Sequence, residues 1–193
     1  DHVHGAPSEW TPKAHGNEAH DPDMLPLSTS DAINAYMSGN KWLSVATSGI
    51  VGLPRQSACW AYLSASQSIP SGTATLVEFD SVLYDRQSEF DTTNHRFVAT
   101  EGGLYLVVVQ LRWNGSTVVA DKLYQVMVRK NGTTRLRADA HAAIANYFAM
   151  NTIAVLSLDA GDYLEVYAYH EAGSNVDLMQ YSHDTFFIVA KIA

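Results

Sequence analysis

The histidines near the start of the chain have spacings at which imidazoles could hold a metal ion. His2 and His4 are two residues apart, so both side chains point to the same side of an extended strand. His15 and His20 are five residues apart, which places them on opposite faces of a strand and about 140° apart on a helix. We therefore consider His2 and His4 as metal ligands, and interpret His15 and His20 as hydrogen-bonding residues of a polar connector.

Catalytic residue types occur in the chain, but not in catalytic spacing. Neither a G-x-S-x-G nor an H-E-x-x-H motif is present. The pair Glu89 and Asp91 has no second carboxylate that the sequence can place opposite it. The other four histidines are scattered, and we interpret them as structural or surface residues: His95, His141, His170 and His183. We therefore predict that the protein is not an enzyme.

A long segment before the last predicted strand carries side chains suited to recognition. HEAGSNVDLMQYSH, residues 170–183, contains Asn175, Asp177 and Tyr181. Long loops on a rigid scaffold are common binding sites, and an aromatic ring beside polar groups suits a carbohydrate. We predict this segment as the receptor-contact region, with a passive loop as the alternative.

A second segment, RLRADAHAAIANY at residues 135–147, is predicted as another long excursion between strands. It begins with Arg135 and Arg137. Two guanidinium groups suit an acidic glycan, or they balance the acidic residues nearby. We include both arginines among the candidate receptor-binding residues.

Composition excludes several classes of protein. Hydrophobic residues make up 47% of the 193 residues, enough for a core, and the net charge is −8 without a Lys/Arg cluster, which argues against nucleic-acid binding. No run of 18 apolar residues occurs, so no membrane insertion is expected. The single cysteine, Cys59, excludes an internal disulfide and a cysteine-based zinc site, and we expect its thiol to be buried. Because the chain begins at Asp1 without a signal-peptide pattern, we expect a processed product or a fragment.

Residues 1–54 are predicted to form an extended assembly arm. Helices are excluded from residues 1–27 by four prolines, Pro7, Pro12, Pro22 and Pro26. STSDAINAYMSG, residues 28–39, has a serine cap and a terminal Gly39, which predict one short helix near 28–38. A helix this short is marginal alone, so we expect it to pack on a partner. Residues 40–54 read as a connector.

From residue 55 onward the pattern is that of strands. Turn signals such as Asn131-Gly132 separate segments rich in β-branched and aromatic residues. The predicted strands are 57–63, 73–79, 95–100, 104–113, 122–130, 147–158, 162–170 and 185–192. A series of short antiparallel strands without intervening helices predicts an all-β sandwich or jelly roll over residues 55–193.

Several of these segments occur in the order and spacing of a known family. SACWAYL, LVEFDSVLYD and HRFVATEGGLYLVVVQL are followed by MVRKNG, LSLDAGDYLEV and the final Phe186-Phe187. Together they resemble the globular head of the C1q/TNF-like superfamily over residues 56–193. The resemblance implies a ten-stranded jelly roll that assembles as a homotrimer, binds proteins or carbohydrates, and has no catalytic activity. The chain lacks a collagen stalk and the cysteines of vertebrate members, so their ligand residues are not carried over.

The trimer is also expected on physical grounds. Residues 104–113 and 147–158 are apolar on both faces, and an isolated sandwich would expose one of them. A threefold contact would cover that surface.

Heads of this family often bind calcium, and six aspartates fall near the ends of the predicted strands. Carboxylates from several loops are the ligands that calcium prefers. No EF-hand spacing organises these residues, which are Asp80, Asp85, Asp91, Asp139, Asp177 and Asp184. We consider calcium binding as a hypothesis, with solvated surface carboxylates as its alternative.

The segments HVHG and HGNEAHDPD, at residues 2–5 and 15–23, are similar to the His/Gly/Asp-rich connectors of bacteriophage tail-fibre and minor tail proteins. Fibres with His-x-His repeats can hold an iron ion through six imidazoles on a threefold axis. The resemblance thus implies iron or zinc on a trimer axis, held by His2 and His4 of three chains.

The functional interpretation is a non-enzymatic phage structural protein of the extracellular virion. Its arm would dock into other virion proteins, and its trimeric head, on a tail or fibre, would attach to a glycan or protein of the host surface. One alternative is a capsid or tail decoration protein without a receptor. Another is a secreted bacterial C1q-like surface protein.

Overall fold

The computed structural model describes residues 33–37, 40–45, 51–53 and 55–193. The chain divides into two compact units, Asp1–Gly52 and Leu53–Ala193. The first unit contains an antiparallel sheet of order β1-β2-β3. Its strands are β1 (Ile33–Met37), β2 (Asn40–Val45) and β3 (Val51–Gly52). The second unit, called the head below, contains the remaining strands.

The helix predicted near residues 28–38 is wrong where the structure describes it. Residues Ile33–Met37 form strand β1, with Ile33 paired to Val45 of β2. A helix of two or three turns gains little stability by itself, whereas a neighbouring strand satisfies the backbone of a segment containing Ile33 and Tyr36. Outside the described residues lie 28–32, 38–39 and the histidines His2, His4, His15 and His20.

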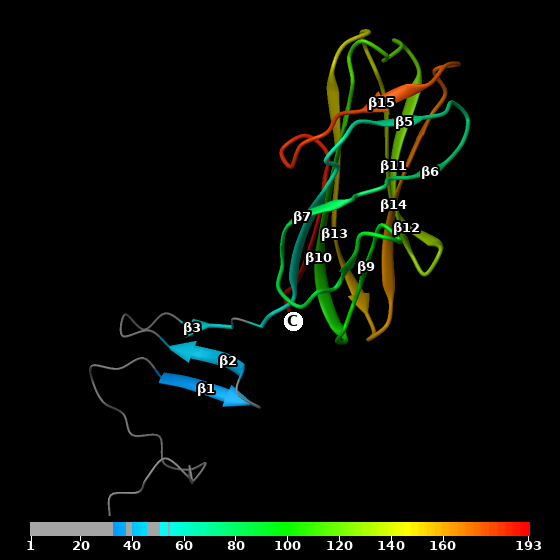
Figure 1. Ribbon diagram of the computed structural model, residues 1–193. Helices are drawn as coiled ribbons and strands as arrows, with labels where there is room; N and C mark the ends of the chain where they lie inside the picture. The colour runs from blue at the N-terminus through cyan, green and yellow to red at the C-terminus, as the bar shows by residue number, and fades with distance from the viewer. Residues whose placement is uncertain (1–32, 38–39, 46–50, 54) are drawn as a thin grey trace, which may run out of the picture. The chain divides into compact units, whose positions relative to one another are not determined.

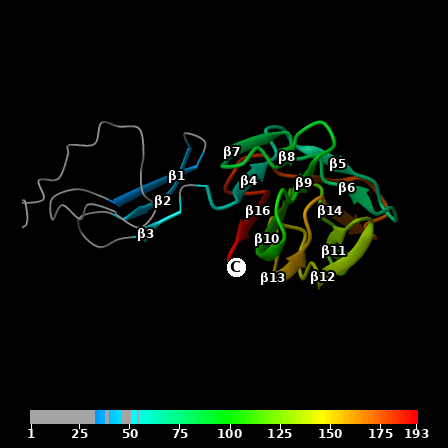
Figure 2. The same cartoon turned by 90° about the horizontal axis from the view of Figure 1, so that it is seen from below.

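The head consists of two antiparallel sheets that face each other (Figures 1 and 2). The first, here the β10 sheet, has the order β5-β15-β10-β16-β4-β7, with β13 also paired to β10. Its strands are β4 (Ala58–Tyr62), β5 (Gln67–Ile69), β7 (Ser81–Asp85), β10 (Gly103–Trp113), β13 (Phe148–Leu158), β15 (Val176–Leu178) and β16 (Phe186–Lys191).

The second sheet, here the β14 sheet, has the order β12-β11-β14-β9-β8, with β6 also paired to β14. Its strands are β6 (Thr75–Leu76), β8 (Phe90–Asp91), β9 (Arg96–Val98), β11 (Leu123–Lys130), β12 (Thr133–His141) and β14 (Tyr163–His170). Chain order alternates between the sheets, so neighbouring strands in space are mostly distant in sequence.

The all-β prediction is confirmed, and each of the eight predicted segments contains a strand. The two sheets hold seven and six strands, more than the expected ten, because several pairing segments are only two or three residues long. Within the described part of the chain, no helix has the length and apolarity needed to cross a membrane.

The loop predicted over residues 135–147 is wrong for its first half. Thr133–His141 form strand β12, which pairs with β11 and lies at the edge of the β14 sheet. The segment alternates, because Leu136, Ala138 and Ala140 pack against the core while the residues between them are exposed. Small alanines at the inward positions weaken the apolar pattern, which explains why the sequence does not read as a strand.

The core lies between the sheets and is filled by alternate residues of each strand. In β10, Tyr105, Val107 and Val109 are buried, and the residues between them face the other way. Cys59 is buried as predicted, and this burial raises the pKa of its thiol. The thiol therefore behaves as a small apolar side chain.

Two of the motifs that carry the family resemblance meet at one turn. Asn131 and Gly132 join β11 to β12 with φ values of 50° and 77°, a left-handed conformation that asparagine and glycine tolerate best. The Asn131 side chain accepts from the Tyr163 amide at 2.9 Å and donates to Asp162 at 2.6 Å. Lys130 also pairs with Asp162, and these hydrogen bonds lower the pKa of that carboxyl to about 2. The motif residues thus tie two hairpins together.

His170 is fully buried in an aromatic cluster at one end of the core. Its ring lies 5.6 Å from both Trp113 and Tyr124. Nε2 donates to the Ile69 carbonyl at 2.8 Å, and Nδ1 accepts from the Ala172 amide at 3.2 Å. This geometry requires a neutral imidazole. Burial lowers the pKa of His170, and the hydrogen bond to Ile69 offsets part of that effect.

We expect acid to destabilise the head through His170. Below pH of about 6.5 the unfolded histidine binds a proton that the folded one does not, so stability present above that pH is lost as the pH falls towards the lower folded pKa. The loss from one such proton is at most about 1.4 kcal/mol per pH unit. Urea unfolding between pH 7.5 and 5.0 measures it. In His170→Gln the slope should be smaller, and equal slopes in both proteins would contradict the assignment.

Candidate functional site

The outer face of the β10 sheet carries a row of apolar side chains that crosses five strands. Since Val107 and Val109 face the core, Val108 between them faces outward. The residues of the row are paired in register from one strand to the next, in the order Ile153, Val108, Ile188, Trp60 and Tyr84. Ile153 is 66% exposed, so the row is open to its surroundings in a single chain.

Of the two adjacent rows, one is apolar throughout and the other joins two polar residues to two aromatic ones. One contains Val155, Leu106, Ala190 and Ala58, and the other contains Asn151, Gln110, Phe186 and Tyr62. Val155 is 50% exposed, and the indole N–H of Trp60 is buried without an acceptor among the described residues. We call these three rows the apolar face. An exposed apolar surface of this continuity is typical of a protein interface.

The opposite ends of the head differ in character. β4 begins at Ala58, paired with Ala190 near the C-terminus, and ends at Tyr62, paired with Phe186. The end that β4 reaches, together with β5 and β15, is called the tip below (Figure 1). It lies opposite the C-terminus and is built from the loops that follow β4, β10 and β15.

Three of the predicted receptor-binding residues lie on one segment of the tip. Asn175 donates from its side chain to Ser68 at 3.3 Å, and Asp177 is held at its backbone by Asn114 and Thr117. Tyr181 is 52% exposed. The segment expected to be one loop contains the short strand β15, which pairs with β5 and presents these residues on a fixed backbone.

The two predicted arginines lie elsewhere. Arg135 and Arg137 are exposed on β12, the edge strand of the other sheet. Arg137 forms an ion pair with Asp139 at 3.2 Å. The structure therefore does not bring the arginines together with the tip residues.

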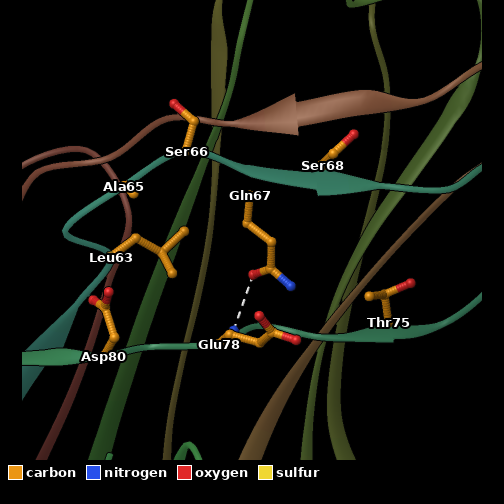
Figure 3. A pocket seen from close by; sticks show the side chains of 8 residues that line it. All are labelled: Leu63, Ala65, Ser66, Gln67, Ser68, Thr75, Glu78 and Asp80. Atoms are coloured by element: carbon orange, nitrogen blue, oxygen red, sulfur yellow. Dashed lines mark hydrogen bonds between the residues drawn. The ribbon is translucent and has the colours of Figure 1, made fainter.

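A pocket of about 410 Å³ opens between β5 and the segment that contains β6 (Figure 3). The residues around it are mostly small and polar: Leu63, Ala65, Ser66, Gln67, Ser68, Thr75, Glu78 and Asp80. Figure 3 shows the side chains of Leu63 and Gln67 directed into the space above Glu78, while Ser66 and Ser68 point to the other side of β5. Apart from Asp80, considered for calcium, the sequence did not single out these residues. Two segments that are close in the chain, residues 63–68 and 75–80, form the pocket.

Hydrogen bonds fix the polar lining of the pocket. The Gln67 amide donates to the Leu76 carbonyl at 2.7 Å and accepts from the Glu78 amide at 2.9 Å. Asp80 accepts from the amide and the hydroxyl of Ser64 at 2.8 and 2.6 Å. Partial burial by itself raises the pKa of Asp80, but these hydrogen bonds outweigh it and lower the pKa overall. Asp80 therefore carries a full negative charge at neutral pH.

Beside the pocket, Tyr181 and His183 form an exposed aromatic pair. Their rings are parallel within 1°, with centroids 5.6 Å apart. The Tyr181 backbone has φ of 88°, a conformation that costs a bulky residue about 1–3 kcal/mol. The Tyr181 amide donates to the Leu63 carbonyl at 2.9 Å, and its carbonyl accepts from Asp184 and Thr185. The loop backbone thus holds the aromatic ring towards solvent.

The aspartates considered for calcium are dispersed over the head. Asp85 caps the Phe90 amide at 2.7 Å, Asp91 caps a turn at Asn94, and Asp184 pairs with Arg112 at 3.2 Å. Within residues 33–37, 40–45, 51–53 and 55–193, no three histidines, cysteines or carboxylates lie close enough to hold a metal ion.

This sheet order and the matched motifs agree with a comparison against known families. The family model described as C1q domain matches residues 59–187. The chain belongs to the C1q domain family. The resemblance inferred from the strand motifs is therefore confirmed, and the C1q domain covers nearly the whole head.

Solved structures support the jelly-roll fold of this C1q domain. A TNF protein, Eiger from S. frugiperda, superposes with a TM-score of 0.56 at 16% identity, covering 72% of this chain and 94% of that one. Murine APRIL gives 0.56 at 19% identity, covering 71% and 99%. The globular domain of zebrafish complement 1qA gives 0.53 at 13% identity, covering 72% and 98%. At these identities the likeness establishes the fold alone.

One relative is similar in sequence. The phage-like element PBSX protein XkdV of Bacillus subtilis is 28% identical over 127 residues, which cover 62% of this chain and 18% of the relative. The matching region is thus less than a fifth of that protein's length.

Removing the Gln67 amide should loosen the pocket. In Gln67→Ala both the Leu76 carbonyl and the Glu78 amide lose their partner, so we expect the free energy of unfolding to fall by about 1–2 kcal/mol. Hydrogen exchange at the Glu78 amide should become faster. As a control, Gln125→Ala removes one exposed bond to Asp139 and should change stability by less than about 0.5 kcal/mol. Unchanged exchange at Glu78 would show that Gln67 does not hold this edge.

Proposed function

We propose that this chain is a phage-associated structural protein whose C1q heads form a homotrimer on a tail or fibre and attach it to the host surface. The apolar face of the β10 sheet carries the proposal. An exposed apolar surface of this kind implies a permanent protein partner, and another copy of the same chain is the simplest such partner.

The geometry of the apolar face favours assembly of identical copies. Towards the tip it ends in polar groups, with Asn151 and Gln110 in its last row and the Arg112–Asp184 pair beyond them. Apolar centres with polar rims are characteristic of stable interfaces. β13 lies at the edge of the sheet, where Ile153 and Val155 project outward, so the face of one copy can receive the edge of the next. Such a contact is heterologous and closes into a ring.

The phage context rests on the relative and on the arm. XkdV belongs to a phage-like element, and this chain matches it over 127 residues. The arm is rich in histidine, glycine and aspartate, as in tail connectors, which supports docking into other virion proteins. We infer that the head is displayed on the outside of a virion or phage-like particle.

A binding role fits the polar groups of the head better than catalysis does. The histidines that lie inside the fold are engaged: His170 is buried between Ile69 and Ala172, and His95 contacts the Phe79 carbonyl at 3.0 Å. The buried hydroxyl of Ser57 donates to Glu89, with no histidine partner among its hydrogen bonds. These arrangements satisfy structural needs and provide no oriented nucleophile and base.

Binding to cells tests the proposal. The fluorescently labelled full chain is titrated onto intact candidate hosts, including Bacillus subtilis, and bound signal is measured with and without purified surface polysaccharide as competitor. Saturable binding that the competitor removes supports attachment. If the chain joins particles stably and no candidate cell binds it, the attachment role is wrong and the decoration role replaces it.

A charged substitution in the apolar face should abolish the trimer. Ile153 is 66% exposed in one chain, so Ile153→Arg should leave the fold intact while placing a guanidinium in each interface. Sedimentation should give three times the 21.1 kDa chain mass for the wild type and one chain mass for the variant. Thr93→Arg, in an exposed turn, is the matched control and should stay trimeric. A variant that keeps the wild-type mass would place the interface elsewhere.

A further inference from the structure

We propose that the tip binds a neutral or amino sugar of a surface glycan, stacked on Tyr181 and His183 and hydrogen-bonded to Glu78 in the adjacent pocket. This inference rests on the proposed attachment function and specifies its ligand. The proposal is based on three observations. Two aromatic rings form an exposed platform, hydrogen bonds join this platform to the pocket, and the charged residues that line the pocket are all acidic.

The platform has the properties that a sugar ring requires. The rings of Tyr181 and His183 are stacked on each other, and with the His183 side chain 77% exposed the pair presents an outer ring face to solvent. The negative faces of such rings attract the weakly positive C–H groups on the flat side of a pyranose. Backbone strain at an exposed aromatic residue indicates a selected position, because φ of 88° at Tyr181 would be relaxed by glycine.

The platform and the pocket form one structural unit. Leu63 lines the pocket, and its carbonyl receives the Tyr181 amide at 2.9 Å. Ser66, also in the lining, donates to the side chain of Gln180 next to the platform. Asn175 donates to Ser68, on the same side of β5 as the Ser66 contact. These hydrogen bonds fix the segment of Tyr181 to β5, so the aromatic pair and the pocket keep one relative position.

The chemistry of the pocket selects the class of sugar. Glu78 is exposed, and within the described part of the chain its carboxylate makes no hydrogen bond, so both oxygens can accept from hydroxyl or ammonium groups. Asp80 adds a second negative charge, and the lining contains no lysine, arginine or histidine. Two carboxylates repel uronic and sialic acids, accept neutral hexoses, and attract an amino sugar with a free ammonium group.

This assignment competes with an acidic glycan on β12. Arg135 and Arg137 lie on the edge of the other sheet and would prefer a carboxylated ligand. The two sites therefore predict opposite charge preferences and different sensitive residues.

The test uses the full-length trimeric protein on immobilised oligosaccharides that represent neutral, amino and acidic sugars. We expect binding to neutral or amino sugars, and at least tenfold weaker binding by Tyr181→Gly. Glycine adopts the Tyr181 backbone without strain, so the melting temperature of this variant should equal or exceed that of the wild type. Glu78→Gln should weaken binding of amino sugars at least tenfold and of neutral sugars less. Tyr163→Ala and Glu101→Gln, at the end of the head opposite the tip, should bind within twofold of the wild type.

Cell binding by the same variants separates this inference from the proposed function. If Tyr181→Gly and Glu78→Gln bind cells and sugars as the wild type does, the tip site is wrong and attachment stands. Binding of acidic sugars alone, lost in Arg135→Ala or Arg137→Ala, also overturns it in favour of β12. If the wild type binds neither cells nor sugars, both ideas fail.

Discussion

Strand β10 is apolar on both faces, and the architecture of the head follows from that. Its inward residues, among them Val107 and Val109, form the core with the β14 sheet. Its outward residues, such as Leu106 and Val108, point away from the β14 sheet, and among residues 55–193 no second layer of strands packs on that side. β10 pairs along its full length with β13 on one side, and it pairs with β16 on the other. The apolar outer surface therefore extends over several strands. One strand therefore contributes both to the interior of the fold and to the apolar face.

Hydrogen bonds to buried polar groups fix the positions of the loops on this sandwich. Glu89 is 2% exposed, and its carboxylate accepts from the Ser57 hydroxyl and from the amide and hydroxyl of Thr100. It joins the residue before β4 to the second residue after β9. His170 does the same at the tip, between Ile69 and Ala172. Each group would destabilise the core if it were left unpaired, so these contacts hold each loop in one position.

The head has two exposed regions that differ in chemistry, the apolar face and the polar pocket. The apolar face lies over β4, β16 and β10, whereas the pocket lies on the β5–β6 side of the head (Figure 2). The two regions adjoin where β4 ends, because Tyr62 belongs to the apolar face and Leu63 to the pocket lining. Since β4 runs from one region to the other, the chain links the interface to the tip within five residues.

The sequence alone determined the all-β class, the positions of the main strands and the apolar character of β10, because alternation and turn residues act locally. It also indicated the family through ordered motifs, while Tyr181 as a receptor contact stays a prediction. It was wrong about the helix at Ile33–Met37 and about the loop that became β12, because both depend on a partner strand. Only the tertiary structure separated Arg135 and Arg137 from the tip. It also assembled the pocket, since Gln67 on β5 meets Glu78 after β6 only because these two strands pair with β15 and β14 in different sheets.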